Sequence, residues 1–127
     1  MNNYQKAIEN SNIVSKTDIN GIITFVNDEF CNLFGFTKDE LIGKNHNIIR
    51  HPDTPKENFE LLWNTILDKK VYKSTVKNIS KNGEDIYLNT TIIPILDEKE
   101  ENIVEFVAIR YDITNEVLLQ KELLLPQ

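Results

Sequence analysis

Three consecutive runs of alternating apolar and polar residues occupy the C-terminal half of the chain, and they leave few folds open. The runs extend over Val71 to Ile79, Asp85 to Leu96 and Ile103 to Ile113. A period of two is typical of strands that bury one face. The connections, 80–84 with its Asn-Gly pair and the acidic 97–102, are short enough to pair neighbouring strands antiparallel. The pattern therefore predicts a three-stranded antiparallel meander.

Two further β-rich runs lie near the N-terminus. They cover Asn12 to Asp18 and Ile22 to Val26, and the Asn20-Gly21 pair between them suits a hairpin turn. Residues 115–127 are expected to be helical, with leucines one heptad apart. The first ten residues place Tyr4, Ala7 and Ile8 at helical spacing, which predicts a short amphipathic helix.

Helix signals fill the middle of the chain. Asn27 is expected to cap a first short helix that ends at Gly35, and Thr37 and Glu40 form a capping box for a second. Residues 45–53 are polar and contain a proline, so we expect a loop with one helical turn there.

The longest helix is expected to begin at Pro55, with Asp53 or Thr54 as its cap. An apolar stripe at helical spacing marks its buried face. The stripe consists of Phe59, Leu62, Trp63, Ile66 and Leu67.

These elements predict an α+β fold, a five-stranded antiparallel sheet with helices packed on one face, flanked by N- and C-terminal helices. We expect residues 1–11 to form an N-terminal cap helix, 12–113 one sensor domain, and 114–127 a C-terminal linker helix. A ligand pocket would lie between the sheet and the helices.

Charge and composition exclude several classes of function. The net charge of -6 and pI near 4.9 disfavour nucleic-acid binding, and no apolar run approaches the ~20 residues of a membrane helix. A cytoplasmic protein without direct membrane insertion is expected. The single Cys31, expected to be a small buried residue, cannot form an internal disulfide, and no metal-ligand spacing occurs. No catalytic motif stands out, so we do not expect an enzyme.

Several short motifs, taken in order, resemble the PAS family of sensory domains from Ile13 to Thr114. They imply the PAS fold for the sensor domain and signalling through contacts with a partner. The motifs are Thr17-Asp-Ile-Asn-Gly21, Phe34-Gly-Phe36, Glu40-Leu-Ile-Gly43, Lys81-Asn-Gly83 and Tyr111-Asp-Ile-Thr114.

A more specific motif, His46-Asn-Ile-Ile-Arg-His-Pro-Asp53, followed by Pro55, Phe59 and Leu62-Trp63, resembles the FAD-binding PAS domains of bacterial aerotaxis receptors. Those domains report redox state to a chemotaxis signalling partner. Tyr72 stands where those receptors usually have a second Trp, and a tyrosine can still stack on a ring system. The resemblance implies a cofactor site formed by Arg50, His51, Asp53, Trp63, Asn78, Tyr72 and His46.

Chemistry suggests a role for several of these residues. Arg50 could hold a pyrophosphate, Asn78 could hydrogen-bond the isoalloxazine edge, and Trp63 could cover a ring face. Without the resemblance, Arg50 and His51 would be solvated loop residues and Trp63 a core aromatic. A photoreactive cysteine of the LOV branch would belong in the turn 47–50, so Cys31 does not fit that role.

The resemblance implies a domain that binds FAD and reports redox or oxygen state to an output domain or a separate chemotaxis receptor or signalling protein. A homodimer is expected. The alternative is a PAS dimerisation or interaction module without flavin, either empty or binding another small ligand such as haem, with His46 as the axial ligand.

Overall fold

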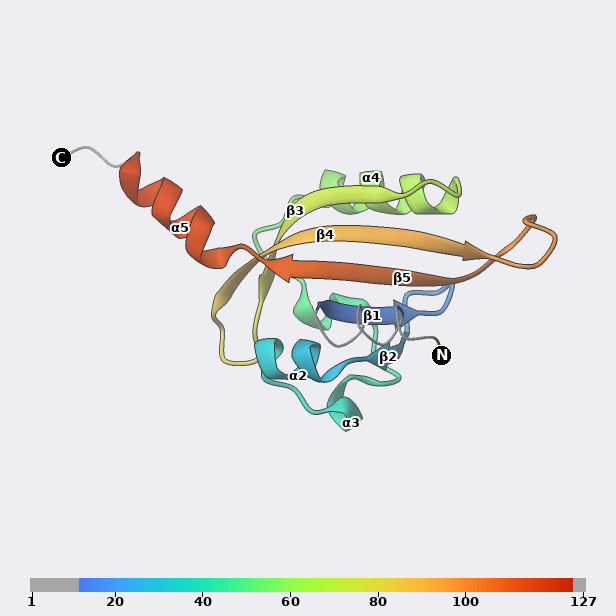
Figure 1. Cartoon of the computed structure of the whole chain (residues 1–127), viewed down its shortest axis with the longest axis horizontal. Helices are drawn as coiled ribbons and strands as arrows, with labels where there is room; N and C mark the ends of the chain where they lie inside the picture. Colours follow the sequence, from blue (N-terminus) through green and yellow to red (C-terminus); the bar gives the residue numbers. More distant parts are fainter. Residues whose placement is uncertain (1–11, 125–127) are drawn as a thin grey trace.

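A five-stranded antiparallel sheet forms the centre of the computed structural model, which describes residues 12–124. The strands are arranged in the order β2-β1-β5-β4-β3 (Figure 1). The N-terminal hairpin therefore lies beside the last strand and not beside the third. The strands are β1 (Ile13–Thr17), β2 (Ile23–Val26), β3 (Tyr72–Ile79), β4 (Asp85–Leu96) and β5 (Ile103–Asp112).

The register of the sheet sorts its residues into two faces. Ser15 pairs with Ala108, and Thr90 pairs with Arg110, so these four side chains point to the same face. The last strand, β5, lies in the middle of the sheet, with β1 of the first hairpin on one side and β4 of the second hairpin on the other. Residues on β5 thus contact both halves of the domain.

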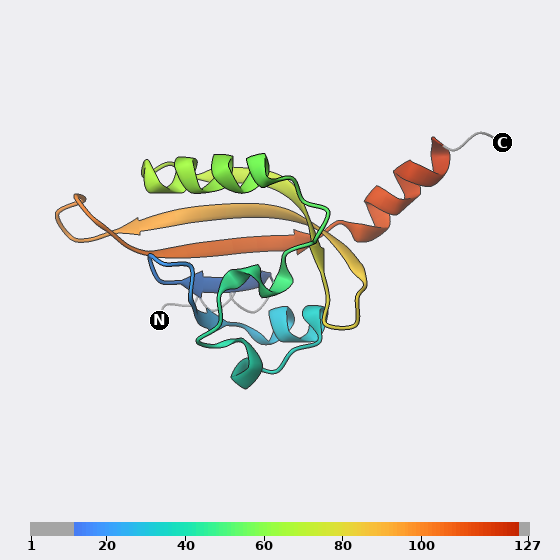
Figure 2. The same cartoon turned by 180° about the vertical axis from the view of Figure 1, so that it is seen from behind.

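Helices cover one face of the sheet, as the view from that side shows (Figure 2). The α+β fold expected from the sequence is thereby confirmed. The helical elements are α2 (Asp28–Phe34), α3 (Lys38–Leu41), the 3-10 helix η1 (His46–Ile49), α4 (Lys56–Leu67) and α5 (Thr114–Leu123).

Caps fix the short helices where the sequence predicts them. The side chain of Asn27 accepts a hydrogen bond from the backbone N–H of Phe30, and α2 ends at Gly35 with φ of 79°. Both bonds of the Thr37–Glu40 capping box are present. A prediction that failed concerns α4: its N-cap residue is Pro55, which has no side-chain cap hydrogen bond, and not Asp53 or Thr54.

The apolar core is formed by residues of β1, β2, β4, α2, α3 and η1. Phe30, Phe34 and Leu41 are fully buried there, and half-buried Cys31 packs against the same cluster. In contrast, α4 buries only Ile66 completely, while Trp63 remains half-buried and Leu67 is exposed. The apolar stripe of α4 therefore covers a hollow and not a filled core.

The helix α5 leaves the sheet at the end of β5 and points away from it (Figure 1). Two hydrogen bonds join α5 to Tyr87 of β4: at its first residue, Thr114 Oγ1 accepts from the Tyr87 N–H at 3.0 Å, and from its last turn Lys121 Nζ donates to Tyr87 Oη at 2.7 Å. The expected cap helix over residues 1–11 lies outside the described residues, as do positions 125–127 of the expected linker. No helix in 12–124 has the length and apolar character needed to cross a bilayer.

Candidate functional site

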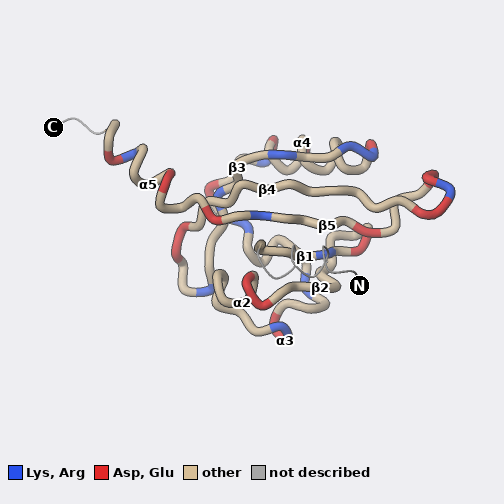
Figure 3. Tube along the Cα trace, in the orientation of Figure 1, with Lys and Arg blue, Asp and Glu red and all other residues tan. Residues whose placement is uncertain are grey.

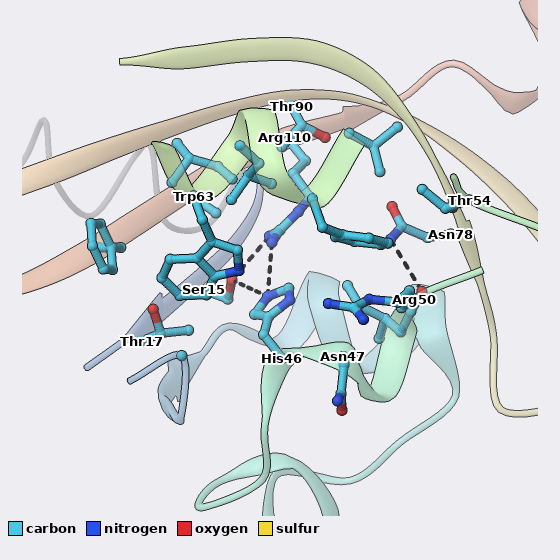
Figure 4. Close-up of a pocket in the computed structure, with 18 of the residues that line it drawn as sticks. Ser15, Thr17, His46, Asn47, Arg50, Thr54, Trp63, Asn78, Thr90 and Arg110 are labelled. Carbon is cyan, nitrogen blue, oxygen red and sulfur yellow. Dashed lines mark hydrogen bonds between the residues drawn. The ribbon is translucent and has the colours of Figure 1, made fainter. Parts of the chain in front are cut away.

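A cavity of about 230 Å³ lies between the sheet and the layer formed by η1 and α4. Its walls come from β1, η1, α4, β3, β4 and β5, so elements far apart in the sequence meet there (Figure 4). Aromatic and aliphatic side chains of α4 and the sheet line it together with a similar number of polar and charged ones. Apolar walls with polar groups among them are typical of small-molecule sites.

Three polar side chains form a cluster on one wall of the cavity. Arg110 donates from Nη1 to Ser15 Oγ at 3.0 Å and from Nη2 to His46 Nε2 at 2.9 Å. Ser15 Oγ lies 3.1 Å from the same His46 nitrogen. Figure 4 shows Arg110 reaching from the sheet toward His46 and Ser15, next to Trp63.

The cluster holds His46 in its neutral form. Since a guanidinium can only donate, His46 Nε2 must accept, and its proton is on Nδ1. Burial, together with the charge of Arg110, lowers the pKa of His46 to about 3. Burial also lowers the pKa of Arg110 to about 9, so Arg110 is still a cation at neutral pH.

Asn78 on β3 presents an unused acceptor in this cavity. Its Nδ2 donates to the Ile49 carbonyl at 3.1 Å, which attaches η1 to the sheet. Its Oδ1 is buried and, alone among the buried side-chain oxygens and nitrogens of 12–124, has no hydrogen-bond partner. An unpaired buried acceptor costs roughly 1–3 kcal/mol, and a ligand that donates to it would recover this energy.

Arg50 follows η1 at the cavity wall. Its guanidinium carbon lies 3.5 Å from the centroid of the Phe59 ring on α4, a cation–π contact between the loop and the helix. A backbone bridge also joins Arg50 to Asn78. The side chain is exposed and lines the cavity, so it can meet an anionic group there.

His51 is buried, and its ring nitrogens are occupied by protein partners. Nδ1 accepts from the Asp53 backbone N–H at 3.0 Å, so the proton is on Nε2, which donates to Asp85 Oδ1 at 2.8 Å. His51 thus fixes the loop on the sheet and leaves no ring nitrogen for a ligand.

Trp63 closes another part of the cavity. Its ring meets Phe106 of β5 edge-on with centroids 5.9 Å apart. A side-chain carbon at Gly21 would lie 3.3 Å from two atoms of the indole, so the glycine allows the β1–β2 turn to approach the ring closely. The indole therefore forms a wall of the cavity and is held in place by contacts with Phe106 and the β1–β2 turn.

Asp53 and Tyr72 do not line this cavity. They lie in an adjoining hollow of about 210 Å³ between α4 and β3. Phe59, Leu62 and Lys77 line both spaces, so the two hollows share a wall. The seven residues predicted as one site are thus divided between two adjoining spaces.

Polar residues outside the predicted set also line the cavity, among them Arg110, Ser15, Thr17 and Thr90. A signal existed on β5. Arg110 is in phase with buried Phe106 and Ala108, so a charged residue occupies a position that faces the helices. Such a residue is costly to bury without a functional or structural reason.

The geometry weakens a haem role for His46, because its free lone pair already accepts from Arg110. Within 12–124 there is no group of three or more histidine, cysteine or carboxylate side chains that could hold a metal ion.

Proteins of known role are similar to this chain in sequence. The aerotaxis receptor of Escherichia coli (strain K12) is 34% identical over 114 residues, which are 90% of this chain and 22% of the receptor. A blue-light photoreceptor of Listeria innocua serovar 6a is 38% identical over 104 residues, 82% of this chain and 40% of that protein. The chain therefore spans well under half of these relatives.

Solved structures show the same fold. An RNA-binding light-oxygen-voltage receptor superposes with a TM-score of 0.82 at 14% identity, covering 94% of this chain and 35% of that one. The light-state LOV domain of Aureochrome1 gives 0.76 at 21% identity, covering 94% and 98%. The family model described as "PAS domain" matches residues 10–115, so the chain belongs to the PAS domain family.

Proposed function

We propose that this chain is a sensory PAS domain that binds FAD and reports redox or oxygen state to a signal-transduction partner. Receptors and regulators of signalling are the relatives that support the sensory part of the proposal. The observation that supports a flavin most directly is the buried, unpartnered Oδ1 of Asn78 in a cavity that Trp63 and Phe59 also line. The aerotaxis receptor and the blue-light photoreceptors leave the kind of flavin and the stimulus open.

Asn78 and Trp63 would hold the ring system. The pyrimidine ring of isoalloxazine has an N–H donor between two carbonyl acceptors, and Asn78 Oδ1 can accept from that N–H. Trp63 offers a flat apolar surface for the tricyclic ring. Bound flavin would supply reversible uptake of electrons, and the protein would orient it and exclude water.

The size of the cavity supports a ligand with a tail. About 230 Å³ is below the ~300–1,000 Å³ of pockets that enclose a drug-sized molecule. The ring system can occupy the cavity while the rest of the ligand extends out of it past Arg50. The guanidinium of Arg50 suits the phosphates of a flavin nucleotide.

The adjoining hollow favours FAD over FMN. Tyr72 provides an aromatic face for a second ring, and the exposed carboxylate of Asp53 can accept from ribose hydroxyls. Lys77 lies on the shared wall and adds a cation where a pyrophosphate would cross. FMN has no second ring to place there.

The position of the cysteine favours a redox stimulus over a light-driven thiol adduct. Cys31 is the only cysteine of the sequence. It lies on α2 against the apolar core and does not line the cavity. The turn that would hold a photoreactive cysteine, 47–50, contains Asn47, Ile48, Ile49 and Arg50.

The wider proposal keeps the sequence-based expectations that the structure does not test. It places the sensor in residues 12–113 and a connecting helix in 114–127, with a cytoplasmic location and a homodimer. Its output would be an attached domain or a separate signalling protein. A flavin-free interaction module is the competing function.

An absorption spectrum distinguishes the FAD-binding sensor from the flavin-free interaction module. Protein purified without added cofactor, and again after addition of FAD, should show bands at about 370 and 450 nm. Replacing Asn78 with Leu should weaken FAD binding by about tenfold, since one hydrogen bond to the ring is lost. Asn89→Leu, on the same sheet but away from the cavity, serves as the control. A colourless protein that does not respond to FAD would refute the proposal.

A further inference from the structure

Among the described residues, Arg110 is a buried cation without a counter-charge. Its side chain faces the cavity from β5, and only 3% of the residue is exposed. Its hydrogen-bond acceptors, Ser15 Oγ and neutral His46 Nε2, carry no formal charge. Within 12–124, no carboxylate forms an ion pair with it.

The cavity as a whole has the opposite sign to the chain. The sequence has 20 acidic residues and a net charge of -6, yet none of the described residues lining the cavity is acidic. Its cations are Arg50, Lys77 and Arg110. Lys77 has Asp85 at 3.6 Å, and Arg50 is exposed to water, so Arg110 is the cation whose charge stays unbalanced. Figure 3 shows acidic residues gathered instead on helix ends and turns, among them the β4–β5 turn.

Burying an unpaired ion costs several kcal/mol, and hydrogen bonds to neutral groups recover only part of this. The face of Phe30, 5.5 Å from the guanidinium carbon, adds a weak cation–π contact. The protein thus maintains a positive potential at a site that is largely shielded from bulk water. A ligand that carries negative charge would gain most from such a position.

Building on the proposed flavin site, we propose that Arg110 is a charge-selecting residue that makes the cavity bind the reduced, anionic flavin more tightly than the neutral oxidised one. Reduction adds two electrons and one proton, FAD + 2e⁻ + H⁺ → FADH⁻. The proton goes to N5, and the negative charge is shared by N1 and the C2 carbonyl. A dihydronicotinamide or a quinol could supply the electrons, and Arg110 contributes only its charge.

The preference has a consequence for signalling. A site that binds the reduced form more tightly raises the midpoint potential of the bound flavin, by thermodynamic linkage. Reduction would also draw Arg110 toward the ring and away from Ser15 or His46. Because His46 begins η1 and Ser15 lies on β1, that change reaches two elements that line the cavity.

The test compares Arg110→Met with the unaltered protein. Removing the unbalanced charge should raise the free energy of unfolding of the flavin-free protein, seen as a higher urea midpoint, since Ser15 can still donate to His46. The dissociation constant of oxidised FAD, from the quenching of flavin fluorescence, should change little. The dissociation constant of reduced FAD, obtained from that value and the midpoint potential in a dithionite titration, should rise about tenfold or more.

Two further variants keep the test independent of folding problems. Arg110→Lys preserves the charge and should keep the ratio of the two dissociation constants within about twofold. Arg110→Gln is neutral but polar and should lose the preference as the Met variant does. Lys73 is exposed on β3 and does not line the cavity, so Lys73→Met is the control for removing a positive charge outside the site.

Each outcome bears on the inference. If FAD binds but the ratio is the same in the Met and Gln variants as in the unaltered protein, the charge-selecting role is wrong while the flavin proposal stands. The role is also wrong if the Met variant loses stability and affinity for both forms equally, since that marks a purely structural arginine. If neither form binds to the unaltered protein, both proposals fail.

Discussion

Arg110 on β5 donates a hydrogen bond of 2.9 Å to Nε2 of His46, the first residue of η1, across 64 positions of sequence. The bond joins the middle strand of the sheet to the loop that carries Arg50. It also assigns the imidazole proton to Nδ1, because the guanidinium cannot accept. One contact thus fixes both a side-chain tautomer and the place of the loop over the sheet.

This contact predicts how stability depends on pH. The pKa of His46 is about 3 in the folded protein and about 6.5 when the chain is unfolded, so between these values the unfolded state binds the extra proton. The free energy of unfolding should therefore fall as pH falls from about 6.5 toward 3, by about 1 kcal/mol per pH unit. Urea unfolding at a series of pH values measures it.

The comparison protein for that series is His46→Gln, whose carbonyl oxygen can accept from Arg110 but does not titrate. Carboxylates titrate in both proteins, so the difference between the two curves isolates His46. A difference that stays constant from pH 7 to pH 4 would contradict the prediction.

Gly21 should be sensitive to substitution because of Trp63. Its φ of 81° is unfavourable for alanine, and the new Cβ would lie 3.3 Å from the indole. Gly83 has a similar φ of 85° but nothing within 4 Å, which makes Gly83→Ala the matched control. We expect Gly83→Ala to lose about 1 kcal/mol of stability and Gly21→Ala about 1 kcal/mol more. Equal losses in urea titrations would show that the indole moves aside freely.

His51 should matter for stability first and for ligand affinity through the loop that it holds. His51→Leu removes the bonds to Asp85 and to the Asp53 N–H, so the unfolding free energy should fall by about 2 kcal/mol. Asp85→Asn keeps an oxygen acceptor and should lose about half as much. Hydrogen exchange at the Asp53 amide should accelerate in the Leu variant; protection that persists would refute the assigned role.

The adjoining hollow predicts selectivity between flavins. Tyr72→Ala should weaken FAD binding by about tenfold and leave FMN binding within about twofold, since only FAD has a second ring to place there. Lys73→Ala, on the neighbouring exposed position, is the control. Fluorescence titrations with both flavins give the numbers. An equal loss for both would show that Tyr72 does not contact the adenosine half.

Local patterns predicted most of the fold. The strand β4 has the bounds that its alternation predicts, and the capping box of Thr37 and Glu40 forms as expected. These features depend on neighbours in sequence, so they can be read from it. The cap of α4 could not be predicted in this way. The backbone N–H of Asp53 instead donates to His51, a contact that depends on how the loop packs against β4.

The candidate site was predicted in part for a related reason. Motif resemblance identified Asn78, Trp63 and Arg50, which do line the cavity. It did not predict that Tyr72 and Asp53 lie in a second space. It did not predict Arg110 either, which reaches the site only because β5 pairs with β1. Long-range strand order determines that meeting, and no local pattern encodes it.

The strand that carries Arg110 also leads into α5, whose first residue is only four positions further along. With ten residues, α5 is about 15 Å long and stands clear of the sheet (Figure 1). A rotation of about 10° where it leaves β5 would displace its far end by about 3 Å. A small change of direction where α5 leaves β5 would therefore move its far end by about the length of a side-chain contact, provided that the hydrogen bond from Lys121 to Tyr87 opens.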